Sequence, residues 1–546
     1  MFMTEKPIVQ NLNDGSKSWN HRFNLFTAKI YLPKSNLPSD IINFGFSAPY
    51  LLYFTDQLLS DSDAKTLAEK SGLSKIAERH AGSVVFISPN NEGGWEKAPE
   101  GIFEEIIENS KIHQYHENGF AILLNRFTNS CDGYAIRGAI YKTCVYGKGK
   151  AADYIAKNLL KPLNGAGLWG PADVTPTVCI LENLSVKPEF GRRNMPVASI
   201  NNSSEINAII KESTDFSYFA DGDDVNYGEV YDSFAGKFRR WGWTGDLQDE
   251  PDFEALGMIE EPCFAEVKTS KDNNGDDKGT EKHKIGYISY YNKNLFNEGS
   301  VPLLLCFHGG GDSAKYIAQV SEWYKVAHDH NFLLVCIENH LNSTATEMME
   351  LIEILKKQYK IDETRIFASG FSMGGCKSWD LYQEYPKVFA GLAPMDATFE
   401  LGLNVFGQPS PVEINKTELV PVFYAGGEIT PLPELPFQAE KCRERMEYVL
   451  KVNRCTAKYD VKFEDKDNWE NKIWGISGDL VNVVHDNSRD SDLTMNFFAS
   501  DDGIFYTVFA SISGQGHECR YHTCENAWLF LSQFQRTKDG KIVLAE

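Results

Sequence analysis

The sequence is short of positive charge and contains no long apolar run. Its 54 Lys and Arg residues stand against 76 Asp and Glu residues, which gives a formal net charge of -22 at pH 7. Because such a surface repels phosphate backbones and anionic lipid headgroups, we expect neither nucleic acid nor a membrane as a partner. No apolar run in the sequence approaches the roughly 20 residues that cross a bilayer as a helix.

The sequence also lacks paired cysteines and an evident leader. Its 11 cysteines are odd in number and include no C-x-x-C pair. Cys179, Cys306 and Cys336 lie inside apolar, strand-like runs, where a free cysteine behaves as a small hydrophobe. Residues Met1–Pro7 do not show the charged-then-apolar pattern of a secretory signal. These features predict a reducing, cytoplasmic location.

The length of the chain predicts two domains. A chain of 546 residues exceeds what one hydrophobic core normally supports. In both halves strand-like runs alternate with helical patterns, which predicts α/β domains with mostly parallel sheets. We place a non-catalytic domain at residues 1–245 and a catalytic domain at residues 246–546. The second contains more chain at about 429–505 than a sheet crossover needs, so we expect an insertion there.

One stretch in the second half carries the strongest chemical signal. Residues Arg365–Cys376 read R-I-F-A-S-G-F-S-M-G-G-C, an apolar run that meets a G-x-S-x-G motif at the start of a helical pattern. A strand, a sharp turn and a helix are the context in which this motif presents a nucleophilic serine. Ser372 is therefore the predicted nucleophile, and the small residues Gly370 and Gly374 leave room for the turn.

A second motif begins 64 residues before the serine, at His308. The apolar run Val301–Phe307 ends in His308-Gly309-Gly310-Gly311. Glycines in such a loop let backbone N–H groups point at a carbonyl oxygen. We expect the oxyanion donors to be Gly309 or Gly310 together with Met373, and we expect His308 to support the loop by hydrogen bonding.

The general base follows by elimination. Only His485, His517 and His522 come after Ser372 in the chain. His485 lies in a strand-like run and His522 begins a helical pattern, whereas His517 lies in a glycine turn directly after a strand. A loop at the carboxyl end of the last strand can reach the serine, so His517 is the predicted base.

The acid is harder to assign. It should follow the strand Val420–Tyr424, whose loop neighbours the histidine loop at the same edge of the sheet. Glu428 is the first carboxylate there, and a glutamate can hold the imidazole tautomer as an aspartate would. Asp396, one strand earlier, and Glu434 remain open as alternatives.

The first half reads as a degenerate copy of the second. Pro49–Phe54 parallels Pro302–Phe307, Gly147–Ala151 lies where the serine motif lies, and Pro176–Ile180 parallels Pro421–Tyr424. In this alignment Gly149 takes the place of the nucleophile. No histidine occurs between residues 116 and 283, so the first copy has no base and is predicted to be inactive.

Together these motifs resemble a known family. Tyr359–Gly375, the H-G-G-G loop and Gly516-His517-Glu518 are similar to the α/β-hydrolase group that contains feruloyl esterases and polyhydroxybutyrate-depolymerase-like esterases. The resemblance covers roughly residues 285–535. It implies an α/β-hydrolase fold and ester hydrolysis through an acyl-enzyme, with no metal or cofactor, on a small-molecule or oligomeric ester.

Two other functions stay open at this point. The prolyl-oligopeptidase-type serine peptidases share much of the pattern, but their first domain is a propeller with a period of about 40–50 residues. Residues 1–245 show no such period. A non-enzymatic role suits the first half alone, which we expect to bind substrate, cover the active site or form a homo-oligomer interface.

Overall fold

The computed structural model describes residues 8–34, 48–80, 82–107, 139–167, 170–240, 245–275, 277–310, 312–338, 340–404 and 406–545. Gly311 of the H-G-G-G loop lies outside these residues. The chain divides into two compact units, residues 1–251 and residues 252–546. No helix among the described residues is long and apolar enough to cross a membrane.

The second unit contains the predicted nucleophile and is built on a ten-stranded sheet. Its strands follow the order β14-β15-β17-β16-β18-β19-β20-β23-β22-β21. The central strands β17, β16, β18, β19, β20 and β23 pair in parallel, and antiparallel strands flank them. The strands are β14 Met258–Lys268, β15 Lys282–Asn292, β16 Val301–Phe307, β17 Leu333–Ile337, β18 Ile361–Phe371, β19 Gly391–Met395, β20 Val422–Gly427, β21 Leu480–Asp486, β22 Ser491–Ala499 and β23 Phe505–Ile512.

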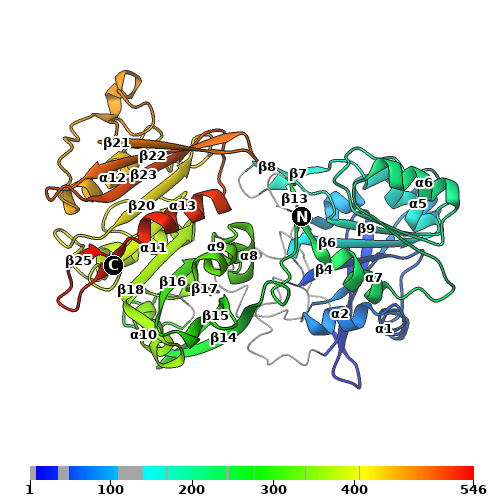
Figure 1. Ribbon diagram of the computed structural model, residues 1–546. Coiled ribbons are helices and arrows are strands. Elements are labelled where there is room, and N and C mark those ends of the chain that lie inside the picture. The colour runs from blue at the N-terminus through cyan, green and yellow to red at the C-terminus, as the bar shows by residue number, and fades with distance from the viewer. Residues whose placement is uncertain are drawn as a thin grey trace. The chain divides into compact units, whose positions relative to one another are not determined.

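Helices cover both faces of this sheet, as Figure 1 shows for the green to red part of the chain. They are α8 Ala314–Val320, α9 Trp323–His330, α10 Ala345–Gln358, α11 Met373–Glu384, α12 Glu440–Val452 and α13 Tyr521–Leu531. Alternate residues of β16, Leu303, Leu305 and Phe307, join one buried cluster with residues of α10, α11 and α12. On the other face Trp528 of α13 stacks on Phe332 with ring centroids 3.8 Å apart. Strands buried on both faces explain the continuous apolar runs of the sequence.

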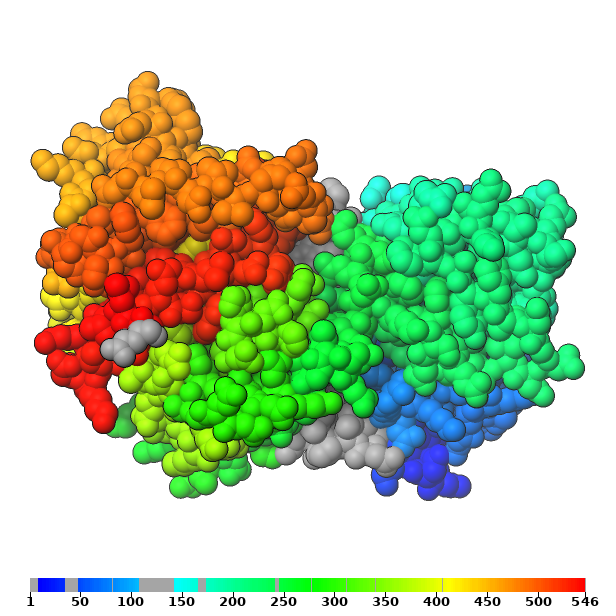
Figure 2. Space-filling view, in the orientation of Figure 1, coloured from blue at the N-terminus to red at the C-terminus, as the bar shows by residue number. Residues whose placement is uncertain are grey.

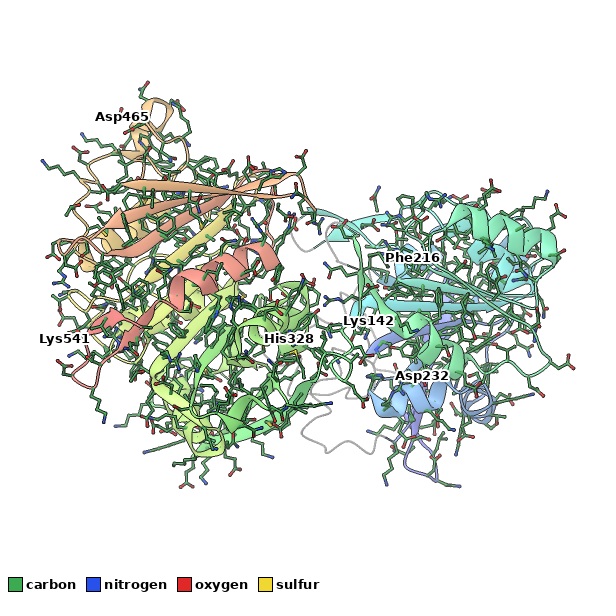
Figure 3. The ribbon with its side chains drawn as sticks, in the orientation of Figure 1. Lys142, Phe216, Asp232, His328, Asp465 and Lys541 are labelled. Carbon is green, nitrogen blue, oxygen red and sulfur yellow. The ribbon has the colours of Figure 1, made fainter. Side chains whose placement is uncertain are left out.

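The predicted insertion contributes to the core of the second unit. Residues 429–505 contain α12, the short helix η6 Phe463–Asn468 and the antiparallel pair β21–β22, and β22 extends the sheet by pairing with β23. Trp474 is fully buried and stacks on Phe509 at a centroid distance of 5.2 Å. The tryptophans therefore serve packing. Figure 2 shows the orange surface of this segment, and Figure 3 labels Asp465 of η6 at its outer end.

The first unit repeats the strand order of the second. Its nine-stranded sheet runs β1-β2-β3-β5-β4-β6-β9-β10-β11, with parallel pairing from β5 to β11. The strands are β1 Gln10–Asn11, β2 Lys17–Arg22, β3 Phe26–Leu32, β4 Pro49–Phe54, β5 Val84–Pro89, β6 Ala139–Lys148, β9 Val178–Glu182, β10 Val197–Ile200 and β11 Ser217–Ala220. The helices are α1 Asp61–Lys70, α2 Leu73–Arg79, α5 Lys150–Asn158, α6 Ser204–Ser213 and α7 Tyr227–Ser233.

The likeness of the two units extends to the backbone of the predicted serine turn. Gly149 has φ 58° and ψ -121°, and Ser372 has φ 54° and ψ -120°. The N–H of Gly149 donates to the Glu182 carbonyl at 2.8 Å, as the N–H of Ser372 donates to the Met395 carbonyl at 3.0 Å. Both units thus have the strand order of an α/β-hydrolase fold, and the first keeps the turn without the serine.

One local prediction needs correction. Val178–Glu182 is the neighbour of the turn strand β6, so it corresponds to β19 rather than to Pro421–Tyr424. Elsewhere in the first unit, α1 and α2 are separated at Gly72, whose φ of 78° is left-handed. The polar loop after β14 is partly buried, because Asn273 donates to the Glu347 carboxylate at 3.0 Å.

Candidate active site

Ser372 occupies a strained turn between β18 and α11. Its φ of 54° with ψ of -120° lies outside the regions that ordinary L-residues favour. The backbone hydrogen bond from Ser372 to Met395 and the bond from the Cys376 N–H to the Ser372 carbonyl, both 3.0 Å long, hold the residue at the first turn of α11. The side chain is half-buried. Strain of this kind persists where the surroundings over-determine it, which is typical of functional sites.

Close packing explains the glycine on the helical side of this turn. A β-carbon on Gly374 would lie 2.1 Å from the Phe307 carbonyl oxygen. A side chain at this position would therefore push β16 away from α11. The glycine brings the end of β16, and with it the following H-G-G-G loop, directly against the serine turn.

This packing gives a prediction about stability. Gly374→Ala is expected to lower the free energy of unfolding by about 1–3 kcal/mol, the usual cost of overpacking. Gly516→Ala is the matched control, because a β-carbon there has no atom within 4 Å. Thermal unfolding of the full chain measures both. Equal melting temperatures for the two variants would contradict the close packing.

The predicted oxyanion loop lies beside the start of α11. A β-carbon on Gly310 would lie 2.4 Å from the Met373 Sδ, and one on Gly309 would lie 3.1 Å from the Phe371 ring. Met373 is the first residue of α11, where the backbone N–H has no acceptor within the helix. The structure therefore brings Gly309, Gly310 and Met373 together beside Ser372.

His308 supports this loop, in agreement with its expected role. Its side chain is fully buried, and its Nε2 donates to the Glu338 carbonyl at 2.5 Å. His340 donates in turn to the His308 carbonyl at 2.8 Å. These bonds tie the loop after β16 to the segment after β17.

His517 lies next to the serine turn from the opposite side. It belongs to the loop between β23 and α13, and its ring contacts the ring of Phe371 at a centroid distance of 4.6 Å. The side chain is buried, and this burial lowers the pKa of the imidazole, against the opposing charges of Asp396, Asp312 and Glu518. Within the described part of the chain, no hydrogen bond joins His517 to Ser372. Such bonds are often long in enzymes without substrate and tighten in the complex.

The carboxylate that contacts His517 is Glu434. Its Oε1 lies in contact with the Nδ1 of His517, and the two side chains are 3% and 6% exposed. Glu428, the expected acid, lies elsewhere: its carboxylate accepts a 2.8 Å bond from the Ser511 hydroxyl. The Glu428 N–H donates to the Ile512 carbonyl at 3.0 Å, which continues the pairing of β20 with β23. This pairing aims the Glu428 side chain at β23, so the structure does not bring Glu428 and His517 together.

Asp396, the other alternative, is buried directly after β19. It follows β19 with a φ of 47°, is 2% exposed, and accepts a 2.8 Å bond from the Gly427 N–H. Burial raises the pKa of Asp396 well above its usual value, and the neighbouring Glu434 raises it further. Burial likewise raises the pKa of Glu434, to about 8. The carboxyls of Asp396 and Glu434 and the imidazole of His517 are thus all buried.

A separate cavity of about 600 Å³ lies at the opposite edge of the same sheet. Its lining includes Val301 and Asn331, at or before the amino ends of β16 and β17, and Arg365 in the amino-terminal half of β18. Ser372 follows the carboxyl end of β18. The cavity therefore belongs to the other side of the sheet and not to the candidate active site.

Comparison with known proteins points to esterases. No family model matches the chain. The bifunctional acetylxylan esterase/xylanase XynS20E of Neocallimastix patriciarum is 24% identical over 250 residues, which are 44% of this chain and 32% of that protein. The chain thus matches about a third of the relative's length. This relative confirms the resemblance to serine esterases that the sequence motifs predict.

Solved structures are similar at low identity. The acetyl xylan esterase from Aspergillus awamori is 11% identical, with 49% of this chain and 98% of that chain covered and a TM-score of 0.32. The S-formylglutathione hydrolase from Staphylococcus aureus is 14% identical, with 36% and 87% covered and a TM-score of 0.27.

Proposed function

We propose that the second unit is a serine carboxylic-ester hydrolase that works through an acyl-enzyme. The observation that carries the proposal is the strained Ser372 at the start of α11, with the buried His517–Glu434 pair against the preceding residue, Phe371. A nucleophile, a base and an acid that orients the base are the parts that acyl transfer requires.

Each residue has a role in the proposed reaction. Glu434 accepts the Nδ1–H of His517 and so leaves Nε2 as the base that takes the Ser372 proton. The serine oxygen attacks the ester carbonyl, and the N–H groups of Met373 and of Gly309 or Gly310 stabilise the oxyanion. His517 then returns its proton to the leaving alcohol. Water, activated by the same histidine, hydrolyses the acyl-enzyme.

The substrate is proposed to be a small or oligomeric ester. The name of the N. patriciarum relative makes acetylated xylan the first polymer to test. Feruloylated sugars are the second, because the sequence motifs resemble feruloyl esterases. Neither acyl group is encoded in a recognisable motif, since pocket shape sets such preferences.

The peptidase alternative has less support. A propeller would show repeated small sheets, whereas the described strands β1–β6 and β9–β11 of the first unit form one continuous sheet. Gly149 at the nucleophile position favours a non-catalytic role for the first unit, such as substrate binding or oligomer formation.

The function is tested with p-nitrophenyl acetate, butyrate and octanoate, methyl ferulate, acetylated xylan and a chromogenic prolyl peptide. We expect hydrolysis of at least one ester and none of the peptide. Incubation with a fluorophosphonate should also add one label to the peptide that contains Ser372, detected by mass spectrometry. Peptide cleavage without ester cleavage would favour the peptidase, and a label on another serine would overturn the assigned nucleophile.

A further inference from the structure

His340 is a buried histidine that the proposed reaction does not use. It begins the short helix η5 His340–Asn342, which follows β17, and its side chain is fully buried. Its Nε2 donates to the His308 carbonyl at 2.8 Å, at the start of the predicted oxyanion loop. The rings of His308 and Phe307 contact the His340 ring at centroid distances of 4.5 and 5.5 Å and fix its orientation.

The other ring nitrogen of His340 shows that the ring does more than fill space. Because a carbonyl oxygen only accepts, Nε2 carries the proton and Nδ1 is a bare acceptor. Burial holds the pKa of His340 well below its usual value, which keeps the ring neutral at ordinary pH. Within the described part of the chain nothing donates to the buried Nδ1. A buried acceptor without a partner costs stability, so the donor at Nε2 is the feature that needs an explanation.

The hydrogen bond from His340 sets the direction of a backbone N–H group. In a trans peptide the carbonyl and the N–H point in opposite directions, so holding the His308 carbonyl toward His340 leaves the Gly309 N–H facing away from His340. The Gly309 carbonyl accepts the Asp312 N–H at 3.2 Å, so the Gly310 N–H faces away from Asp312 in the same manner. Among the residues that the structure describes, neither glycine N–H has an acceptor.

The segment that contains His340 is also tied to the helix of the nucleophile. The Nζ of Lys377, on α11, donates to the carbonyl of Ser343 directly after η5, at 2.7 Å. Lys377 is 6% exposed, and its Nζ lies 3.6 Å from the carboxylate of Asp380 on the same helix. Because α11 begins directly after Ser372, these bonds connect the nucleophile to the oxyanion loop through η5.

We propose that His340 is a positioning residue, which holds the His308–Gly309 peptide so that the N–H groups of the oxyanion loop face the reacting carbonyl. This inference rests on the proposed function and adds to it a residue that touches no substrate. The bond from His340 is already formed before substrate binds, so the donors need no reorganisation when negative charge develops in the transition state.

Two substitutions of His340 separate the donor from the bulk of the ring. His340→Gln keeps an N–H donor at a similar reach, whereas His340→Leu fills the space without a donor. His340→Leu should lower kcat for an activated acetate ester by about 10- to 100-fold with KM within about threefold, because misplaced donors weaken transition-state binding. His340→Gln should recover most of this loss. A kcat unchanged in His340→Leu, or lowered equally in both variants, would overturn the proposal.

His522→Leu is the matched control. His522 belongs to α13 of the same unit, and its Nε2 also lies against a backbone carbonyl, that of Val484 in β21, at 3.2 Å. This substitution removes the same kind of bond at a distance from the oxyanion loop. It should leave kcat and KM unchanged.

The bond from His340 can be observed without turnover. Of the 12 histidines in the chain, only His308 is followed by a glycine. Protein labelled with carbonyl-¹³C histidine and ¹⁵N glycine therefore gives one signal in a carbonyl-to-amide NMR correlation spectrum, from the His308–Gly309 peptide. His340→Leu should shift this signal in the ¹³C dimension, His340→Gln should shift it less, and His522→Leu should leave it in place. A signal that does not move in His340→Leu would overturn the assigned bond.

The wild type gives a measurement that needs no variant to fold. A fluorophosphonate attached to Ser372 places a phosphonyl oxygen where the oxyanion forms, so the His308–Gly309 signal should then move in the ¹H dimension. A fully labelled protein with an unmoved signal would show that this peptide does not face the reacting atoms.

These readouts separate the inference from the proposed function. A wild type that neither hydrolyses an ester nor takes the fluorophosphonate loses the esterase assignment, whatever the NMR signal shows. An active wild type whose kcat survives in His340→Leu loses the role of His340 alone.

Discussion

Ser372→Ala is expected to lower the turnover of an activated acetate ester by about 10⁵- to 10⁶-fold, the effect of removing a nucleophile from a serine hydrolase. The remaining rate should reflect binding and the oxyanion donors, which act without the hydroxyl. The first unit offers no substitute at the equivalent turn, because Gly149 has no side chain there. Initial rates under saturating substrate, compared with buffer alone, measure the effect.

Ser378→Ala is the matched control. Ser378 lies on the same helix, α11, and is also buried, with its hydroxyl bonded to the Gly374 carbonyl at 3.3 Å. Its loss should change turnover by only a few-fold. Substantial activity in Ser372→Ala, with Ser378→Ala unaffected, would show that another residue is the nucleophile and would contradict the assignment of Ser372.

The sequence predicted the parts of the site that depend on short contiguous motifs. A strand, a tight turn and a helix are local features, so the serine turn Gly370–Gly374 could be predicted from contiguous residues. The loop Gly309–Gly310 could be predicted in the same way, because it directly follows a strand. His517 followed from chain order and a glycine turn after a strand. The structure brings all three segments to the carboxyl edge of one sheet, where parallel strands end together.

The sequence favoured Glu428 as the acid and left Glu434 open, whereas the structure places Glu434 against His517 for a physical reason. Glu428 follows β20 at once, but strand pairing continues through its N–H and turns the side chain to Ser511. Glu434 comes after Pro431 and Pro433 in the same loop, and its carboxylate contacts His517. The apolar residues next to Glu434 were a usable signal in the sequence. Leu435 is fully buried in the structure, and a carboxylate buried beside it needs a polar partner.

The first unit has the backbone turn of the second unit with glycine in place of the serine. Glycine accepts the backbone of the turn at Gly149 without strain, so nothing in the fold requires a serine there. Glu182 pairs with Lys148 at 2.7 Å and also accepts the Tyr227 hydroxyl, at the end of the neighbouring strand. A polar network thus lies at the end of β9, beside the turn at Gly149.

Glu434→Gln should lower kcat for the same ester by about 10³- to 10⁴-fold, whereas Glu428→Gln should change it by less than about tenfold. A triad acid holds the correct histidine tautomer and stabilises the imidazolium, and its amide replacement typically costs about 10⁴ in turnover. The Glu428 carboxylate accepts the Ser511 hydroxyl, and its amide variant can keep that bond. Melting temperatures close to wild type would establish that neither loss reflects unfolding. A large loss in Glu428→Gln with an active Glu434→Gln would instead require the loop after β20 to rearrange when substrate binds, and would return the role of acid to Glu428.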